Sequence, residues 1–452
     1  MKNIINNVKA DVCIIGGGSG GLSVAAGTAQ LGLKTILIEQ EKMGGDCLNS
    51  GCIPSKSLLA AAKRAAAARK DDIKGIKPFA PTINFAAVKD HVNHVIKSIE
   101  PNDSVARFTR LGVKVIKAAG YFVGPYQVAA GDQLITARYI VIATGSRPVM
   151  PSIPGLDPKK ILTNENIFKL REKPRHLIII GGGPIGMEMA QAHCRLGAQV
   201  SVVDLRRVLP RDDQAAAAIV KKQLEKEGVK FYEEATIESV AHATGKNNDS
   251  NGKGVTVKIK NYKNEKIIIK GSHLLVATGR KSNTEQLMLG RPRIRISSRG
   301  IVVDKHLRTN LKHVFAIGDC AGGPQFTHTA GYHAGIIIRQ ICFKLPATTN
   351  YHALPWVTYT DPELAQVGIT DRAVMTAPHK FNVCSWPLAD NDRAMTEQDT
   401  AGFVKIITDK KGRVLGGTIV GAGAGEMIGI IGLAVSAKLK ISQLASMIFP
   451  YP

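Results

Sequence analysis

Residues 10–39 read ADVCIIGGGSGGLSVAAGTAQLGLKTILIE, and this stretch decides the fold. An apolar run leads into a Gly-x-Gly-x-x-Gly motif that begins at Gly16, and an alanine-rich segment typical of a helix follows. A second apolar run at 35–38 ends in Glu39, 23 positions after Gly16 and close to the roughly 20 expected of a ribose-binding acid. The glycines permit a tight turn whose N–H groups approach a pyrophosphate at a helix N-terminus. The motif consists of Gly16, Gly18 and Gly21.

Residues 176–204, HLIIIGGGPIGMEMAQAHCRLGAQVSVVD, repeat the same device. Asp204 follows the first glycine of this copy at the same offset of 23 positions. One glycine motif is a weak signal, but two copies between apolar strands, each with an acid at one spacing, form a strong one. Two dinucleotides in one chain indicate a nicotinamide that passes hydride to a flavin. The glycines of the second copy are Gly181, Gly183 and Gly186.

Three further segments fit an α/β protein with dinucleotide-binding units. YIVIATGSRP (139–148) and LLVATGRKSN (274–283) are apolar strands that run into Ala-Thr-Gly turns. HVFAIGDCAGG (313–323) is another strand, and we expect it to end in an exposed acid, Asp319.

Length and composition describe an ordinary globular protein. The 452 residues leave room for about three domains, with 44% hydrophobic and 21% charged residues. We find no run of about 18 apolar residues that would cross a membrane, and the N-terminus has no signal-peptide pattern. We therefore expect a cytoplasmic protein with no membrane partner.

The charge is unusual, because 60 Lys and Arg against 36 Asp and Glu give +24. A nucleic-acid binder is one explanation, and a basic surface that attracts anionic cofactors is another. The basic residues are spread along the chain and only 5% of residues are aromatic. We therefore predict no nucleic-acid partner.

The segment GGDCLNSGCIPSK (44–56) holds two of the seven cysteines, five positions apart. In a regular helix such positions have Cα atoms roughly 8.6 Å apart, and a disulfide needs less than about 7 Å. We therefore expect a helix to begin between the two, near Cys52. We expect the other five to be small buried residues on strands and helices; these are Cys13, Cys194, Cys320, Cys342 and Cys384.

A cysteine near a helix N-terminus has a lowered pKa, and Lys56 lies one helical turn after Cys52. Lys56 would favour a thiolate or pair with an acid. A zinc site lacks a second ligand pair, although Asp46 is adjacent. A structural disulfide and a redox-active pair are the other two interpretations, and a close pair in a reducing compartment favours redox chemistry.

Together these motifs resemble the class I pyridine nucleotide–disulfide oxidoreductases, in the branch of dihydrolipoamide dehydrogenase and mercuric reductase. The resemblance spans essentially the whole chain. It rests on GGDCLNSGCIPSK, ATGSRP, ATGR, AIGD and YTDPELAQVG (359–368) in the family's order.

The resemblance implies two Rossmann-type domains, for FAD and NAD(P), and an α+β interface domain that makes a homodimer. The FAD domain would comprise 1–149 and 271–345, the NAD(P) domain 150–270, and the interface domain 346–452. The pair Cys47–Cys52 would then carry electrons between NAD(P)H and a small dithiol or disulfide substrate.

The resemblance also implies roles for single residues. Cys52 would lie nearest the flavin, and Cys47 would exchange with substrate. Lys56 would pair with Glu188 close to the flavin's reactive edge. The first glycine turn would hold FAD, with Glu39 bound to its ribose and Asp319 near its ribityl chain. The second glycine turn would hold the nicotinamide cofactor. Further cofactor-binding residues would be Gly45, Thr144, Gly145 and Gly279.

Charge near the second turn bears on the choice of nicotinamide. Asp204 would accept hydrogen bonds from a ribose 2′-OH and repel a 2′-phosphate, which favours NAD. Arg206 and Arg207 follow at once and could hold that phosphate, so NADP stays open. The tyrosine that gates the pocket in some relatives is replaced by Pro184.

The C-terminus departs from the family pattern. A histidine before a proline is the base of dihydrolipoamide dehydrogenases, and Tyr451 stands there, before Pro452. Tyrosine, with a pKa near about 10, is a poor base at pH 7. Because the motif is cut at Pro452, we expect a longer natural chain, in which the tyrosine would remain. Mercuric reductases share the FPY sequence but use a C-terminal cysteine pair, and no cysteine follows Cys384.

We therefore predict a dihydrolipoyl dehydrogenase-like enzyme. A mercuric-reductase-like enzyme that reduces a metal or a quinone is one alternative, and a redox-sensing flavoprotein with little turnover is another.

Overall fold

The computed structural model describes residues 6–70, 73–242 and 254–452. The chain forms two compact units, each built from three separate stretches of sequence. The first comprises Met1–Pro54, His91–Val149 and Arg280–Thr349, and the second comprises Ser55–Asp90, Met150–Gly279 and Asn350–Pro452.

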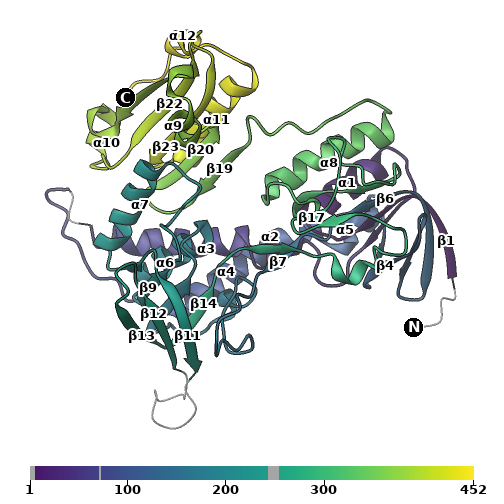
Figure 1. Cartoon of the computed structure of the whole chain (residues 1–452), viewed down its shortest axis with the longest axis horizontal. Helices are drawn as coiled ribbons and strands as arrows, with labels where there is room; N and C mark the ends of the chain where they lie inside the picture. The colour runs from purple at the N-terminus through teal and green to yellow at the C-terminus, as the bar shows by residue number, and fades with distance from the viewer. Residues whose placement is uncertain (1–5, 71–72, 243–253) are drawn as a thin grey trace. The chain divides into compact units, whose positions relative to one another are not determined.

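A seven-stranded sheet forms the centre of the first unit, in the order β3-β2-β1-β6-β5-β4, with β18 paired to β6 (Figure 1). Five strands are parallel: β1 (Asn6–Ile15), β2 (Thr35–Ile38), β3 (Lys114–Ile116), β6 (Gln133–Ile142) and β18 (Val314–Ala316). The hairpin of β4 (Gly120–Gly124) and β5 (Gln127–Ala130) adds an antiparallel edge.

Both faces of this sheet are covered, as its parallel strands require. Successive residues of β1 face opposite clusters: Cys13 joins one hydrophobic core and Ile14 the other. The helices α1 (Ser19–Gln30) and α8 (Thr327–Cys342) lie side by side over the second core (Figure 1). They approach closely because Gly27 has no side chain, since a Cβ there would lie 2.4 Å from the Cδ1 atom of Ile338.

Short elements complete the first unit. They are α2 (Gly45–Asn49), η1 (Glu100–Asp103), α5 (Val105–Arg110), η3 (Glu285–Leu287), η4 (Gly318–Ala321), the pair β7 (Ser146–Pro148) and β15 (Arg280–Ser282), and the pair β16 (Ile296–Ser297) and β17 (Gly300–Ile301). The helices α3 (Cys52–Ala67) and α4 (Phe85–Ile99) each contribute residues to both units.

The second unit contains a four-stranded parallel sheet in the order β10-β9-β8-β14. Its strands are β8 (His176–Ile180), β9 (Gln199–Val203), β10 (Lys230–Tyr232) and β14 (His273–Val276), with η2 (Ile167–Lys169), α6 (Pro184–Arg195) and α7 (Gln214–Lys226). An antiparallel sheet of β11 (Thr236–His242), β12 (Val255–Lys260) and β13 (Lys266–Gly271) shares a hydrophobic core with it.

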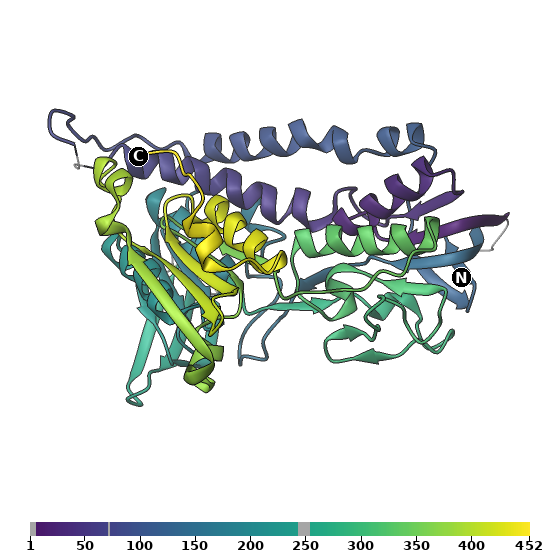
Figure 2. The ribbon, with the colours of Figure 1, turned by 90° about the horizontal axis from the view of Figure 1, so that it is seen from above.

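The C-terminal part forms a five-stranded antiparallel sheet in the order β19-β20-β23-β22-β21, with α11 (Ala424–Ser436) across one face (Figure 2). The strands are β19 (Pro355–Thr358), β20 (Glu363–Gly368), β21 (Phe381–Pro387), β22 (Phe403–Asp409) and β23 (Val414–Gly421). The remaining elements are α9 (Asp371–Thr376), η5 (Pro378–Lys380), η6 (Leu388–Asp390), α10 (Asp392–Thr396) and α12 (Ile441–Ala445).

The prediction of five buried cysteines outside the pair is only partly right. Cys13 and Cys320 are buried, but Cys194 and Cys342 are half-buried and Cys384 is exposed. Cys384 lies on β21, which is the edge strand of its sheet and is exposed along nearly its whole length. The apolar sequence around Cys384 therefore reflects strand propensity rather than burial.

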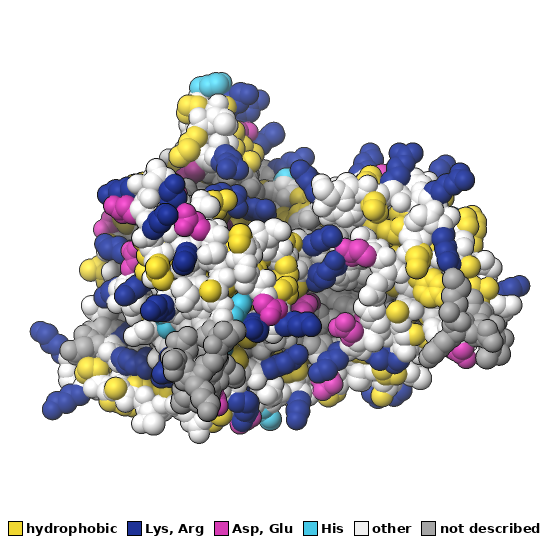
Figure 3. All heavy atoms as spheres, turned by 60° about the horizontal axis from the view of Figure 1, so that its bottom comes forward, with side chains coloured by type: hydrophobic (Ala, Val, Ile, Leu, Met, Phe, Trp, Pro, Cys, Tyr) yellow, Lys and Arg dark blue, Asp and Glu magenta, His cyan; other side chains and the backbone are white. Residues whose placement is uncertain are grey.

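No helix among the described residues is long and apolar enough to span a bilayer. Lys and Arg side chains are scattered over the face drawn in Figure 3, where they stand among polar and apolar groups.

Candidate functional site

The first glycine turn joins β1 to α1 and admits no larger residue at two of its positions. Gly16 has a φ of +112°, and a Cβ there would lie 2.3 Å from the carbonyl oxygen of Ala143. A Cβ at Gly21 would lie 1.9 Å from the Gly16 oxygen. The Ala143 amide donates to Ile15, so the Ala-Thr-Gly turn after β6 packs against the glycine turn.

The second glycine turn, between β8 and α6, repeats this geometry. Gly181 has a φ of +110°, and its Cβ would lie 2.4 Å from the oxygen of Ala277, in the other Ala-Thr-Gly turn. The Cβ of a residue at Gly186 would again lie 1.9 Å from the Gly181 oxygen. The two motifs therefore form the same backbone structure, each in its own unit.

The two acids at the strand ends also occupy equivalent positions. The Oε2 atom of Glu39 accepts the Gly17 N–H at 2.6 Å, and the Oδ2 atom of Asp204 accepts the Gly182 N–H at 2.6 Å. The other oxygen of each acid accepts the amide two residues further along the chain, at 2.6 and 2.8 Å. A carboxylate has about four lone-pair sites, so each acid keeps capacity for ribose hydroxyls.

Both turns fit a dinucleotide. Gly18 and Gly183 are the N-caps of α1 and α6, and neither carries a side-chain cap, so the first-turn N–H groups remain available to phosphate oxygens. A Cβ at Gly183, Gly145 or Gly279 would meet nothing within 4 Å, so these positions border open space. When bound, FAD would supply a two-electron relay between a nicotinamide and a disulfide.

The segment that carries the cysteines is docked on the first glycine turn. The Gly44 amide donates to the Gly17 oxygen at 2.9 Å. Gly45 has a φ of +59°, and a Cβ there would lie 2.7 Å from the Gly18 Cα atom. Glycine is therefore required at residue 45 for close backbone contact, which holds Cys47 beside the start of α1.

The two cysteines lie on separate helices, as the sequence predicts. α2 ends at Asn49 and α3 begins at Cys52. Cys47 and Cys52 are half-buried, are not joined by a disulfide and hydrogen-bond to each other. The Cys52 Sγ atom lies 3.3 Å from the Thr327 hydroxyl at the start of α8.

The surroundings of the two cysteines give their thiols different tendencies to ionise. The pKa of Cys47 is raised, first by its hydrogen bond to Cys52, then by burial, and then by the negative charge that Cys52 carries as a thiolate. Hydroxyl groups of Thr327 and Ser19 oppose this shift. The neighbouring sulfur therefore disfavours ionisation of Cys47, whereas Cys52 begins α3, a position that favours a thiolate.

The prediction that Asp319 is exposed is wrong, because its side chain is only 21% exposed. Burial raises its pKa, and the Ser146 hydroxyl donates to its Oδ2 atom at 2.5 Å. η4 turns the acid inward, which the apolar strand before it does not reveal. The Arg280 Nη2 atom lies 2.8 Å from Asp46 Oδ2, and the Arg280 Nε atom donates to the Ser146 hydroxyl at 2.7 Å. Because that hydroxyl donates to Asp319, Arg280 links the cysteine segment to Asp319.

Arg280 is a site residue for which the sequence motifs predicted no role, although it is the last residue of the quoted ATGR. An arginine that directly follows the second Ala-Thr-Gly turn was the available signal. Thr144 and Asn283 hold the first such turn, through hydrogen bonds of 2.6 and 3.0 Å.

Lys56 and Glu188 form the predicted ion pair in the second unit. The Lys56 Nζ atom lies 2.8 Å from Glu188 Oε2 and 4.4 Å from the ring centroid of Tyr359. The Tyr359 amide also donates to Glu188 at 3.0 Å, so the carboxylate is held by two donors. Tyr359 begins the quoted segment 359–368 but has no predicted role.

Tyr451 is 82% exposed, and its hydroxyl donates to Asp392 Oδ2 at 2.9 Å. This hydrogen bond, with the negative charge of Asp392, raises the pKa of the tyrosine. Tyr451 is therefore protonated at neutral pH even more completely than an ordinary tyrosine, so it is poorly suited to accept a proton there.

Comparison with known families identifies the protein family in which these two turns and the cysteine segment occur. Residues 10–334 match the pyridine nucleotide-disulphide oxidoreductase family, and residues 354–452 match the dimerisation domain of that family. The chain belongs to this family. Its members use FAD and NAD(P)H, which confirms the predicted cofactors and fold class.

Full-length relatives agree with this assignment. Dihydrolipoyl dehydrogenase of Geobacillus stearothermophilus is 34% identical, over 98% of this chain and 94% of its own. Mercuric reductase of Bacillus cereus is 32% identical, over 98% of this chain and 70% of its own. The HOCl-induced flavoprotein disulfide reductase RclA from Escherichia coli matches with a TM-score of 0.85 and 27% identity, over 98% of this chain and 97% of its own.

The protein is thus an FAD-dependent NAD(P)H disulfide oxidoreductase, as the sequence predicts. Among the described residues, no group of three or more His, Cys, Asp or Glu side chains could hold a metal ion.

Proposed function

We propose that the protein is a dihydrolipoyl dehydrogenase-like enzyme that works through Cys47 and Cys52. The observation that carries the proposal is the mutual hydrogen bond of two half-buried thiols on a segment docked at the first glycine turn. In that position a disulfide would lie between the FAD-binding turn and the substrate, where it could take up two electrons from a dithiol.

In the direction of dithiol oxidation, the substrate loses two electrons and two protons, and its two sulfurs form an S–S bond. The electrons first convert the Cys47–Cys52 disulfide to two thiols. NAD⁺ then takes up the electron pair and one proton as hydride, and the second proton is released to solvent. Cys47 would exchange with the substrate and Cys52 would face the flavin.

Lys56 and Glu188 would hold the reactive edge of the flavin. A carboxylate whose side chain is 5% exposed keeps the ammonium in place, and this supports a fixed positive charge at that edge. NAD is the proposed nicotinamide, because Asp204 would repel a 2′-phosphate. The Arg207 Nε atom lies 3.7 Å from Glu234 Oε1. This carboxylate competes with a 2′-phosphate for the guanidinium, which also favours NAD.

We also propose the assembly and the location. The dimerisation domain supports a homodimer, and its match at 354–452 supports an interface domain over 346–452. The FAD domain would keep 1–149 and 271–345, and the NAD(P) domain 150–270. A cytoplasmic location and a small dithiol substrate complete the proposal.

The test is the initial rate with dihydrolipoamide and NAD⁺ at neutral pH, for the native protein and for Tyr451→His. We expect measurable turnover in the native protein and a gain of about tenfold or more in the variant, because histidine titrates near about 6.5 and is the better base. Absence of turnover in both proteins, with NADH oxidised rapidly by other acceptors, would contradict a dithiol substrate.

A second candidate is reduction of a metal ion or a quinone. The exposed Tyr451, with its raised pKa, favours it, because such an acceptor needs no base to deprotonate a thiol. The solved relative RclA forms a Cu(II) complex, which is consistent with metal chemistry in this family. NADH oxidation by Hg(II), Cu(II) or a benzoquinone that is unaffected by Tyr451→His would favour this candidate.

A further inference from the structure

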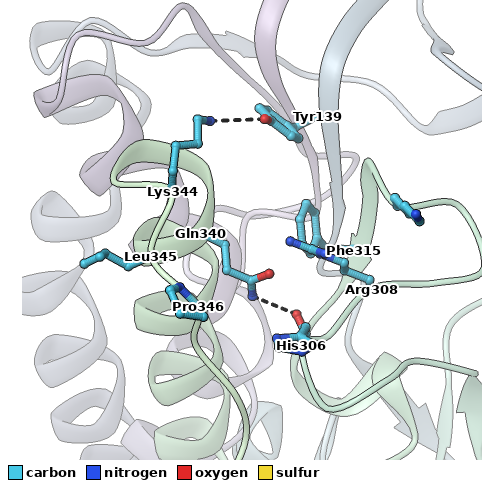
Figure 4. Close-up of a pocket in the computed structure, with 9 residues that line it drawn as sticks. Tyr139, His306, Arg308, Phe315, Gln340, Lys344, Leu345 and Pro346 are labelled. Atoms are coloured by element: carbon cyan, nitrogen blue, oxygen red, sulfur yellow. Dashed lines mark hydrogen bonds between the residues drawn. The ribbon is translucent and has the colours of Figure 1, made fainter.

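A cavity of about 320 Å³ lies in the first unit, between the end of α8 and strands β6 and β18. Figure 4 shows Gln340 and Lys344 on the helix side, and Tyr139, Phe315 and Arg308 on the strand side. The volume is within the range of small-molecule sites. The proposed redox chemistry does not use this cavity.

The cavity and the redox segment lie at opposite ends of α8. Thr327, at the start of the helix, contacts the Cys52 sulfur, whereas Gln340 lies thirteen residues later. At about 1.5 Å per residue this separation is about 20 Å. A ligand in the cavity is therefore distinct from the flavin and from the dithiol substrate.

The lining is strongly cationic. Arg308, Lys312, Lys344 and His306 line the cavity, and none of its described lining residues is acidic. The nearby Asp304 already accepts the backbone amides of His306 at 2.8 Å and Arg308 at 2.9 Å. The buried Nε atom of Arg308 has no hydrogen-bond partner among the described residues. A buried cationic donor without a partner is costly, and an anion would satisfy it.

Gln340 provides an acceptor on the opposite wall. Its side chain is 7% exposed, and its Nε2 atom donates to the His306 oxygen at 2.8 Å. Because a carbonyl can only accept, this bond fixes which end of the amide is the oxygen. The Oε1 atom is buried and, within the part of the chain that the structure describes, has no partner. It requires a donor, such as a hydroxyl group.

We propose that this cavity binds a small phosphate monoester that carries hydroxyl groups. The phosphate would contact Arg308 and Lys312, and a hydroxyl would donate to Gln340. Three Lys and Arg side chains around one cavity favour a dianion over a monocarboxylate, and a guanidinium matches phosphate through paired hydrogen bonds.

A nucleotide fits less well, because the aromatic faces are already covered. The Arg308 guanidinium lies 5.9 Å from the Phe315 centroid, and the Lys344 ammonium lies 5.0 Å from the Tyr139 centroid. Lys344 also donates to the Tyr139 hydroxyl at 3.1 Å, which holds it over that ring (Figure 4). Each of these two rings thus already has a cation over it, which disfavours the stacking of a base.

The test is titration calorimetry of the FAD-loaded protein with glycerol 3-phosphate, with saturating NAD⁺ present to occupy the second glycine turn. Inorganic phosphate and AMP are the comparison probes. Arg308→Met removes a donor to the phosphate, and Gln340→Glu introduces a negative charge that repels the anion. Lys312→Met changes an exposed residue, and it serves as the test if either of the other two variants fails to fold. Arg291→Met removes one positive charge from an exposed site of the same unit and is the matched control.

We expect glycerol 3-phosphate to bind more tightly than inorganic phosphate and AMP. Each cavity variant should weaken it about tenfold or more, because Arg308→Met and Lys312→Met each remove a charge-assisted contact and Gln340→Glu places a negative charge beside the anion. Arg291→Met should change the affinity by less than about twofold. Absence of binding by the native protein, an equal loss in Arg291→Met, or tighter binding of AMP would each overturn the proposal.

Discussion

The Lys56 ammonium and the Glu188 carboxylate are 2.8 Å apart, with Glu188 5% exposed and Lys56 37% exposed. The Tyr359 amide is the second donor to this carboxylate. The Glu188 carboxylate is thus buried and accepts hydrogen bonds from two donors, while the Lys56 ammonium stays partly exposed to solvent. The two donors offset the cost of desolvating the carboxylate, and the carboxylate in turn holds the ammonium in one position.

Lys56→Met should lower the free energy of unfolding by about 1–3 kcal/mol, because it leaves a buried carboxylate with one donor. Chemical denaturation of the FAD-loaded protein measures the change. Lys63→Met is the matched control: its ammonium lies 3.6 Å from Asp361 and is 58% exposed, so we expect a change of about 0–1 kcal/mol. Equal losses in both variants would contradict this account of the Lys56–Glu188 pair.

Gly45→Ala should impair folding of the cysteine segment and reduce the FAD content of the purified protein. The new Cβ would lie 2.7 Å from the Gly18 Cα atom. Gly32→Ala is the control, because Gly32 also has a positive φ, +83°, but nothing lies within 4 Å of its Cβ position. We expect that control to lose only about 1–2 kcal/mol and to retain FAD. FAD absorbance per protein measures both, and full retention in Gly45→Ala would contradict the close contact.

The reactivity of Cys47 in the reduced protein should depend on Cys52. Because the pKa of Cys47 is raised, its alkylation by iodoacetamide should be slow at neutral pH and should accelerate as the pH rises above the ordinary thiol value of about 8.5. Cys52→Ser removes the neighbouring thiolate, so Cys47 should react faster at neutral pH. Mass spectrometry of the modified peptide measures the rates, and a slower reaction in Cys52→Ser would show that the thiolate order is reversed.

Two buried histidines should make the protein sensitive to acid. Burial lowers the pKa of His333 to about 4 and that of His193 to about 3. A histidine held neutral in the fold stabilises it fully above the unfolded pKa of about 6.5, and this contribution is lost as the pH falls through the folded value. His333 alone accounts for up to about 3 kcal/mol between pH 6.5 and 4.

His333→Gln tests this dependence, because a glutamine oxygen can still accept the Gly318 N–H that His333 Nδ1 accepts at 3.0 Å. We expect the variant to lose less stability than the native protein over that pH range. Melting temperatures measured from pH 7 to pH 4 give the comparison, and parallel curves would exclude His333 as a source of the acid sensitivity.

Local rules were enough to predict much of the fold. The turn at Gly16, the strand at 35–38 and the helix start at Cys52 follow from glycine conformation, apolar periodicity and disulfide geometry. The pairing of Lys56 with Glu188 came from the family resemblance, since 132 positions separate the two residues and no local rule connects them.

Other features depend on tertiary contacts that the sequence does not display. Asp319 is turned inward by η4, and Arg280 reaches Asp46 from a distant strand. Cys384 has apolar neighbours in sequence but lies on an edge strand. The sequence also does not show that the Oε1 atom of Gln340 lacks a partner among the described residues, because this depends on which carbonyl the amide nitrogen contacts.

The most direct test of the central claim is lipoamide reduction by NADH with the Cys47→Ser variant. We expect the variant to bind FAD and to allow NADH to reduce it at a rate close to that of the native protein, because the first glycine turn is unchanged. Lipoamide reduction should fall by at least about a hundredfold, because the exchanging sulfur is lost. Lipoamide turnover at the native rate in Cys47→Ser would contradict the assignment of Cys47 and Cys52 as the redox pair.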